Sequence, residues 1–379
     1  MNTDQINFYL EKTFSQNPSD VAHLIKYLYF SGIRFDSKNW YHFTQHKWIR
    51  LDEDQSPLIP IMKNDLVNKY LALANSYNCS VMKLTNELNA VGNVDPDKTE
   101  IYLPLIISDL TNKSKICSEL GLKLNNLSYI QKVIIIAQEL FTQKDFELTL
   151  DLNPLMLGFE NGIFNLKTMQ LEVPTNDANV FMTVGYRYKS ESGYMKEVET
   201  FFEKLGLEKM LPALACLLSG EIRQPLIWIT GLNDKNLSML VQLFEWTFGD
   251  YVGNLPFSTL RKRKIPHFQN HTHTDLANCC RQRIIIVEQT PEDHPSIYQP
   301  MLDILLDQDT LDLRMPYNRR SNNYLPQFGV VVLSANPDTE PPKESLIFQV
   351  SDNIDITSEP KKEWRLDLIK LLFKFYQRK

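Results

Sequence analysis

Apolar residues recur at helical spacing through the first part of the chain, up to about residue 145. In segments 65–74 and 130–140 they stand three and four positions apart, which predicts helices with one buried face. Two aromatic runs, separated by a short polar stretch, lie between the helices and indicate a β-hairpin. We therefore expect residues 1–145 to form a mainly helical region with a hairpin near 40–51.

The pattern changes in the middle of the chain and again in its second half. Short apolar pieces broken by Asn-Pro, Gly and Asn-Gly fill residues 146–192 and predict compact strands and turns. Further on, three β-rich apolar runs lack alternation, which is typical of strands buried on both faces of a mostly parallel sheet. These runs are 226–230, 284–287 and 330–333. Helical patterns, beginning at 195–219, separate them, so we expect an α/β domain over 193–379.

Composition restricts the class of protein. The 379 residues are 43% apolar and 23% charged, which suits a globular protein of two or three domains. The apolar runs are too short for a membrane span, and the polar, acidic N-terminus does not read as a signal peptide. Five cysteines without regular spacing predict reduced thiols. We expect a cytosol-like compartment, with no secretion and no membrane attachment.

The net charge of −6 means that nucleic-acid binding has to come from local patches. The most basic run is Arg261, Lys262, Arg263 and Lys264. A solvated loop is the simpler interpretation of this run, and a contact with nucleic-acid phosphates is the alternative.

Two further groups of residues have both a chemical and a structural interpretation. The aromatic side chains of the predicted hairpin fit base stacking or, more simply, the packed core of the hairpin. They are Trp40, Tyr41, Phe43 and Trp48. A second group pairs histidines with adjacent cysteines: His271, His273, Cys279 and Cys280. Its spacing fits no standard zinc site, so we expect no bound metal.

The first strand of the second half runs into a loop and then a helix, which is the order of a phosphate-binding cradle. Such a cradle needs glycines for converging amides, a lysine for the β and γ phosphates, and a hydroxyl for magnesium. Gly231 and Ser238 match, but Leu237 replaces the lysine and Asn236 replaces its glycine. Lys235 lies two positions early. We therefore interpret Gly231, Lys235 and Ser238 as remnants of a nucleotide site.

Segment 153–168 reads Asn-Pro, then Gly-Phe-x-Asn-Gly, then a Leu-x-Thr turn. It is similar to the signature ahead of the helicase in the primase-helicase family of large DNA viruses, phages and plasmids, whose ATPase is an AAA+ protein of helicase superfamily 3. The order of pieces over 35–376 resembles this family, and the aromatic hairpin resembles an element of its poxvirus-type N-terminal part. The resemblance implies a helicase-associated segment at 146–192 and an AAA+ domain with a mostly parallel sheet at 193–379.

The same resemblance places the remaining chemical residues. Segment 283–288 resembles the second ATPase motif, in which carboxylates serve magnesium and the attacking water. Glu288 is present there, but Gln289 replaces its carboxylate neighbour. In the next motif Asp303 replaces a lysine, and Asn336 matches the polar sensor residue. The arginine pair that the family carries further on is missing, so Glu288 and Asn336 are interpreted as catalytic remnants.

Three arginines fall between these motifs, where the resembling helicases place a DNA-tracking hairpin in a central pore. They are Arg314, Arg319 and Arg320. The resemblance implies that they contact single-stranded DNA in a hexameric ring, and a plain surface hairpin is the alternative.

Together these features predict a virus-encoded, helicase-like protein with degenerate ATPase motifs, located in the cytoplasm or elsewhere inside the host cell. We expect a non-hydrolysing subunit that needs no cofactor and binds single-stranded DNA, replication proteins or copies of itself. One alternative is an active, divergent ATP-dependent DNA helicase that uses Lys235 with ATP and Mg²⁺. Another is a structural scaffold that retains only the fold.

Overall fold

The computed structural model describes residues 3–52, 54–90, 102–191, 193–221, 225–261, 276, 279, 281–293, 296–306, 311–313, 322–350 and 359–378. The chain divides into two compact units. The first consists of Met1–Thr44 and Trp48–Leu148, and the second of Gln45–Lys47 and Thr149–Lys379. The strand-rich segment that follows residue 148 packs as part of the second unit.

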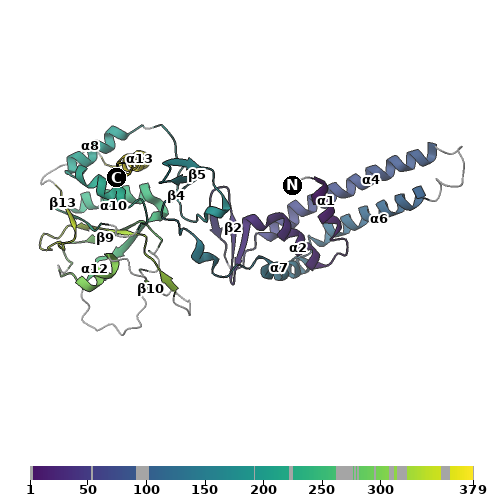
Figure 1. The fold of residues 1–379 in the computed structure, drawn as a ribbon, viewed down its shortest axis with the longest axis horizontal. Coiled ribbons are helices and arrows are strands. Elements are labelled where there is room, and N and C mark those ends of the chain that lie inside the picture. Colours follow the sequence, from purple (N-terminus) through teal and green to yellow (C-terminus); the bar gives the residue numbers. More distant parts are fainter. Residues whose placement is uncertain are drawn as a thin grey trace. The chain divides into compact units, whose positions relative to one another are not determined.

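Helices make up most of the first unit (Figure 1): α1 Thr3–Glu11, α2 Pro18–Tyr29, α3 Leu58–Pro60, α4 Val67–Ala90, α6 Tyr102–Lys123 and α7 Leu127–Phe141, with the 3-10 helix η1 Phe30–Gly32 and the π-helix η2 Ile61–Leu66. The side chains of Asn17 and Asn126 accept amide hydrogen bonds and begin α2 and α7. Helices α4 and α6 lie side by side. The helices predicted around 65–74 and 130–140 are confirmed.

The aromatic hairpin belongs to a small antiparallel sheet of β1 Ile33–Asp36, β2 Asn39–Phe43 and β3 Trp48–Arg50. Trp40, Tyr41 and Trp48 are at most 2% exposed. The ring of Phe146 in η3 Phe146–Thr149 meets the rings of Tyr41 and Trp48 edge-on, with centroids 5.3 and 4.9 Å away. Core packing of the hairpin is therefore confirmed, and these three buried rings are closed to base stacking.

The second unit begins with an antiparallel sheet of β4 Met156–Phe159, β5 Gly162–Asn165 and β6 Gln170–Glu172, followed by η4 Asn176–Ala178. The residues of the 153–168 signature hold this sheet together. Asn161 donates to the carbonyl of Tyr188 at 2.9 Å and accepts its amide at 2.7 Å. A Cβ on Gly158 would overlap the carbonyl oxygen of Met182. The signature thus serves architecture at these positions, because a close backbone approach admits only glycine.

Five parallel strands form the central sheet in the order β13 Leu346–Gln349, β7 Ile227–Thr230, β12 Gly329–Ser334, β9 Ile284–Gln289 and β8 Val252–Pro256. All six residues of β12 are buried, as are the first three of β7 and the first four of β9. The three apolar runs therefore form interior strands, as predicted. The α/β fold class with a parallel sheet is confirmed.

Helices cover both faces of this sheet. One core joins it to α8 Met195–Leu205, α9 Leu211–Cys216, α10 Asp234–Phe248 and α13 Arg365–Tyr376, with the turns η5 Glu208–Met210, η6 Gly249–Tyr251 and η8 Lys362–Trp364. A second core, on the opposite face, contains α12 Gln299–Leu306 and η7 Phe257–Leu260. A separate antiparallel pair is formed by β10 Leu311–Leu313 and β11 Asn322–Tyr324.

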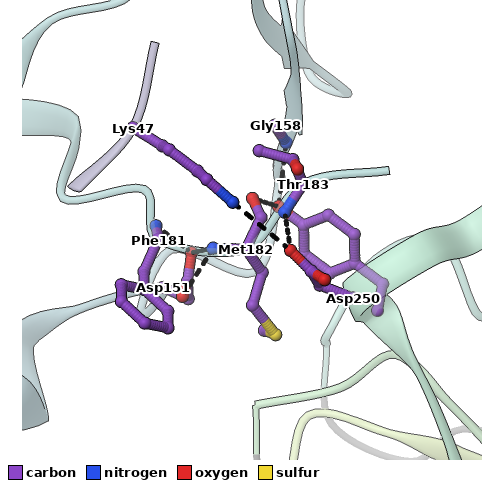
Figure 2. Close-up of polar contacts among 8 residues, drawn as sticks. Lys47, Asp151, Gly158, Phe181, Met182, Thr183 and Asp250 are labelled. Carbon is purple, nitrogen blue, oxygen red and sulfur yellow. Dashed lines mark hydrogen bonds and ion pairs between the residues drawn. The ribbon is translucent and has the colours of Figure 1, made fainter. Parts of the chain in front are cut away.

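Buried polar contacts tie the antiparallel sheet to the parallel one (Figure 2). The Tyr251 hydroxyl accepts the amide of Gly158 at 2.8 Å and donates to the carbonyl of Met182 at 3.0 Å. One residue earlier, the Asp250 carboxylate accepts the amide of Thr183 at 3.0 Å and lies 3.7 Å from Lys47 Nζ. These contacts place the segment after β6 against the start of β8.

Asp151 anchors the same segment from the other end. Its carboxylate accepts the amides of Phe181 and Met182 at 2.9 and 3.2 Å (Figure 2). Burial raises the pKa of this carboxyl, and the two donated hydrogen bonds oppose that shift. Nearby, the buried Arg283 guanidinium donates to the Gln327 side chain and, at 3.2 Å, to the carbonyl of Asn153.

None of the helices within the described part of the chain is long and apolar enough to cross a membrane.

Replacing Gly158 by alanine tests the close approach of the two sheets. The added methyl group meets Met182 O and stands 2.8 Å from Val180 Cγ1, so we expect the free energy of unfolding to fall by about 2 kcal/mol or more. Gly193→Ala is the matched control, because a Cβ there meets nothing within 4 Å. Denaturant titration of both variants checks this expectation, and equal midpoints would contradict it.

Candidate nucleotide site at the carboxyl edge of the parallel sheet

The carboxyl ends of the five parallel strands lie along one edge of the central sheet. In open α/β sheets, ligands bind outside this edge at the point where successive connections run in opposite directions. The chain leaves β7 toward β8 on one side and leaves β12 toward β13 on the other. The segments after β7 and β12 are therefore the expected place for a nucleotide.

The connection after β7 is short. Only residues 231–233 separate the end of β7 from the start of α10. Gly231 has φ of +76°, and a Cβ at this position would stand 3.1 Å from the carbonyl oxygen of Val350. The amide of Val350 in turn donates to Thr230 O at 2.9 Å. The turn is therefore packed against the end of β13, and glycine suits both its φ angle and its crowding.

Helix α10 begins earlier than the cradle alignment expects. The Asn233 side chain caps it by accepting the amide of Asn236 at 2.8 Å, and the Asn233 carbonyl accepts the amide of Leu237 at 2.9 Å. In a phosphate cradle, amides at a helix start point at the ligand and remain free to bind it. Here the first turn uses two of these amides within the chain, and Leu237 and Ser238 already lie inside the helix.

The side chains of α10 follow its helical spacing. Leu237 is 7% exposed and packs in the same core as Leu240 and Phe244. Lys235 and Ser238, three residues apart, are both exposed. The position aligned with the phosphate-binding lysine thus faces the protein interior, while Lys235 faces solvent.

Two neighbouring side chains at the end of β9 lie in different environments. Glu288 is exposed, and burial of part of its surface together with the negative charge of Glu245 on α10 raises the pKa of its carboxyl. Gln289 is fully buried: it donates to Thr339 Oγ1 at 2.6 Å and accepts from Ser334 Oγ at 2.7 Å. The amide that replaces a carboxylate here is therefore held by two hydroxyl groups of the protein.

Asn336, the predicted sensor residue, lies just after β12 and is 7% exposed. Its side-chain amide donates to the carbonyl oxygens of Asp293 at 2.8 Å and Pro291 at 3.3 Å, and its oxygen accepts the amide of Asp338 at 2.9 Å. Asn336 thus binds the loop that follows β9 to the turn that follows β12.

The structure brings Gly231, Glu288 and Asn336 to the same edge of the sheet, on three different strand ends. Of the basic candidates, Arg261 lies half-buried at the end of η7. The other basic candidates lie outside the described residues: Lys262, Arg263, Lys264, Arg314, Arg319 and Arg320. Strands β10 and β11, which flank the three arginines in sequence, pair antiparallel.

Of the four residues in the histidine–cysteine group, the structure describes one. Cys279 is buried, and His271, His273 and Cys280 lie outside the described residues. Among the residues that are described, no group of three or more His, Cys, Asp or Glu side chains is arranged to hold a metal ion.

The sequence alone did not reveal the partners of Gln289 or of Glu288. Thr339 lies 50 residues from Gln289, and Ser334 lies 45 residues away. The one available signal for Ser334 was its place at the end of the strand that precedes Asn336. Glu245 stands among the residues of a predicted helix, where a carboxylate usually faces solvent.

No protein-family model matches the chain. The chain is similar to "Putative helicase L207/L206" of Acanthamoeba polyphaga mimivirus, with 25% identity over 236 residues that cover 59% of this chain and 22% of that protein. It is also similar to "Putative helicase 121R" of Invertebrate iridescent virus 3, with 23% identity over 224 residues that cover 56% of this chain and 24% of that protein. The chain therefore spans about a quarter of the length of these curated relatives.

Among solved structures, the apo C-terminal region of NrS-1 is similar, with 12% identity and a TM-score of 0.35 over 51% of this chain and 47% of that chain. A second apo form of the same region has 12% identity and a TM-score of 0.36 over 52% of this chain and 49% of that chain. The architecture of the second unit defines an α/β protein with a parallel sheet. The similarity to two viral proteins named as putative helicases supports a helicase-like relationship.

The raised pKa of Glu288 has a consequence for stability. A carboxyl whose pKa is higher in the folded state stabilises the fold at acid pH, and this contribution is lost as the pH rises through the folded pKa. Glu288→Gln, which cannot ionise, should therefore raise the denaturation midpoint near pH 7 in the absence of divalent cations. The difference from the parent should shrink toward about pH 4. The control Glu292→Gln removes an exposed carboxylate nearby. A gap that widens at acid pH would contradict this reasoning.

Proposed function

We propose that this chain is a degenerate superfamily 3-type helicase-like protein. It acts as a non-hydrolysing subunit in viral DNA replication by binding DNA or other replication proteins. The observation that carries the proposal is the start of α10, where Leu237 occupies the position of the phosphate-binding lysine and packs into the core. The similarity to viral proteins named as helicases supports the replication context.

Loss of nucleotide chemistry is supported by the missing lysine and also by the geometry of the turn that precedes α10. Lysine and arginine groups on a transferring phosphoryl group are major electrostatic contributions to catalysis. A lysine at position 237 would start from a buried site, where an unpaired ammonium group is costly. The Asn233 cap also takes the Asn236 amide that a phosphate oxygen would need. Restoring one side chain would therefore not restore the cradle.

The other strand ends support the same interpretation. Hydrolysis by this type of site needs carboxylates for magnesium and water and a polar sensor near the γ phosphate. Gln289 cannot bind a metal as a carboxylate does, and its two polar atoms already have partners. The side chain of Asn336 is likewise committed to three backbone groups.

An active, divergent ATP-dependent helicase is the second candidate, because Lys235 is exposed in the first turn of α10 and Glu288 is exposed at the end of β9. In that case ATP and Mg²⁺ would be cofactors. A scaffold that retains only the fold would bind neither nucleotide nor DNA.

Titration with a fluorescent ATP analogue and Mg²⁺ separates the first two candidates. We expect no saturable binding up to about millimolar ligand, the upper range of usual substrate affinities. Lys235→Ala and its control Lys209→Ala, an exposed lysine of η5, should behave like the parent. Saturable, magnesium-dependent binding that Lys235→Ala abolishes and Lys209→Ala preserves would overturn the proposal in favour of an active enzyme.

A further inference from the structure

Three aromatic side chains of the first unit are exposed close together. Phe8 on α1 is 56% exposed, Tyr27 on α2 is 38% exposed, and Phe30 in η1 is 42% exposed. Rings of this size usually bury most of their surface, so several exposed rings in one place indicate a binding surface more than isolated ones do.

Ring contacts join Phe8, Tyr9 and Tyr27 into a row, and Phe30 lies at the end of the same helix α2. The Tyr9 ring stacks on Tyr27, with centroids 3.6 Å apart and an interplanar angle of 28°. Phe8 meets Tyr9 edge-on at 5.6 Å. Phe30 follows Tyr27 by three residues, at the start of η1, and its ring centre lies 6.0 Å from that of Phe141. The row therefore runs from α1 across to the end of α2.

Cationic groups lie over the faces of these rings. Lys12 Nζ lies 4.5 Å from the centre of Phe8 and 5.0 Å from that of Tyr9. Lys26 Nζ and Arg34 Cζ lie 5.4 and 4.4 Å from the centre of Phe30. We call the four rings and three cations the ring–cation row: Phe8, Tyr9, Tyr27, Phe30, Lys12, Lys26 and Arg34.

The nearby carboxylates bond to other groups, so Lys12 and Lys26 have no ion-pair partner among the described residues. Glu11 accepts a hydrogen bond from the Tyr77 hydroxyl, and Asp20 accepts one from Ser15. Asp4, one turn before Phe8, is the remaining carboxylate of α1. The lysines are thus free to move from a ring face to an incoming phosphate, because their stems are long and flexible.

We propose that the ring–cation row binds single-stranded nucleic acid. Bases stack on the exposed faces of Phe8, Tyr27 and Phe30, and Lys12 and Lys26 contact the phosphates between them. Aromatic rings interleaved with cations are the arrangement that binds single strands without sequence preference. A duplex fits less well, because its bases are already stacked on one another. The two lysines favour nucleic acid over a protein partner, since lysine, unlike the aromatic rings, is depleted at protein–protein interfaces.

The row lies wholly in the first unit and shares no residue with the nucleotide edge of the second unit. This inference rests on the DNA binding in the proposed function and gives it a surface, and it does not depend on whether ATP binds. It also assigns nucleic-acid contact to residues that neither the basic run near 261 nor the three arginines near 314 include.

Fluorescence anisotropy of the full chain with a labelled 20-nucleotide oligothymidylate, in buffer of low ionic strength, tests the proposal. Phe8→Ala, Tyr27→Ala and Phe30→Ala should each weaken binding about fivefold or more, and the triple variant should weaken it further. Lys12→Ala and Lys26→Ala should each lower the slope of log K against log salt by about 0.7. A duplex of equal length should bind more weakly than the single strand.

Matched controls separate stacking from general apolarity and charge. Tyr27→Phe keeps the ring and should bind as the parent does, whereas Phe8→Leu keeps apolar surface and should bind as Phe8→Ala does. Tyr298→Ala removes an exposed ring of the second unit, and Lys38→Ala removes an exposed lysine of the first; both should leave binding unchanged. Circular dichroism should show that the triple variant is folded. Absence of oligothymidylate binding, binding that survives removal of all three rings, or equal affinity for the duplex would each overturn the proposal.

Discussion

The hydroxyl of Tyr251 is the contact on which the second unit depends. It joins the amide of Gly158 in the antiparallel sheet to the carbonyl of Met182, while the backbone of the same residue receives the amide of Arg283 at 2.8 Å. A buried hydroxyl with both a donor and an acceptor partner is costly to remove, because each orphaned group loses about 1–3 kcal/mol. Tyr251 also closes the turn that ends α10, so it fixes the far end of the helix whose start faces the nucleotide edge.

This anchoring helps to explain the structure of the candidate nucleotide site at the carboxyl edge of the parallel sheet. Helix α10 is held at its end by the Gly249–Tyr251 turn and at its start by the Asn233 cap. Between these points Leu237, Leu240 and Phe244 are packed into one core, so the helix cannot rotate to expose position 237 without unpacking the sheet. Protein groups also bind the side chains of Gln289 and Asn336. Polar groups that a nucleotide would use therefore stabilise the fold.

The two units differ in whether their polar and aromatic side chains are bonded within the protein or exposed to solvent. At the carboxyl edge of the parallel sheet, the inward polar groups are hydrogen-bonded within the chain. On and beside α1 and α2 the reverse holds: aromatic rings and Lys12 are exposed, Lys26 is half-buried, and the nearby carboxylates of Glu11 and Asp20 accept hydrogen bonds from neighbouring hydroxyls. This surface lies wholly in the first unit and shares no residue with the candidate nucleotide site. The aromatic hairpin beside it contributes packing, since Trp40 and Trp48 are buried.

The sequence by itself determined the fold class and the approximate place of the strands and of the helices at 65–74 and 130–140. Helical periodicity and unbroken β-branched runs report directly on which side chains are buried, and burial is what organises a core. It also singled out Leu237 and Gln289, which differ from the residues that the resemblance implies at these positions. Only the tertiary structure shows the surroundings of these two residues. Helix α10 begins at Asp234, and Gln289 donates a hydrogen bond to Thr339, 50 residues away. The tertiary structure alone brought Tyr9 onto Tyr27, because contacts between residues distant in sequence depend on how helices pack and leave no periodic signal in the chain.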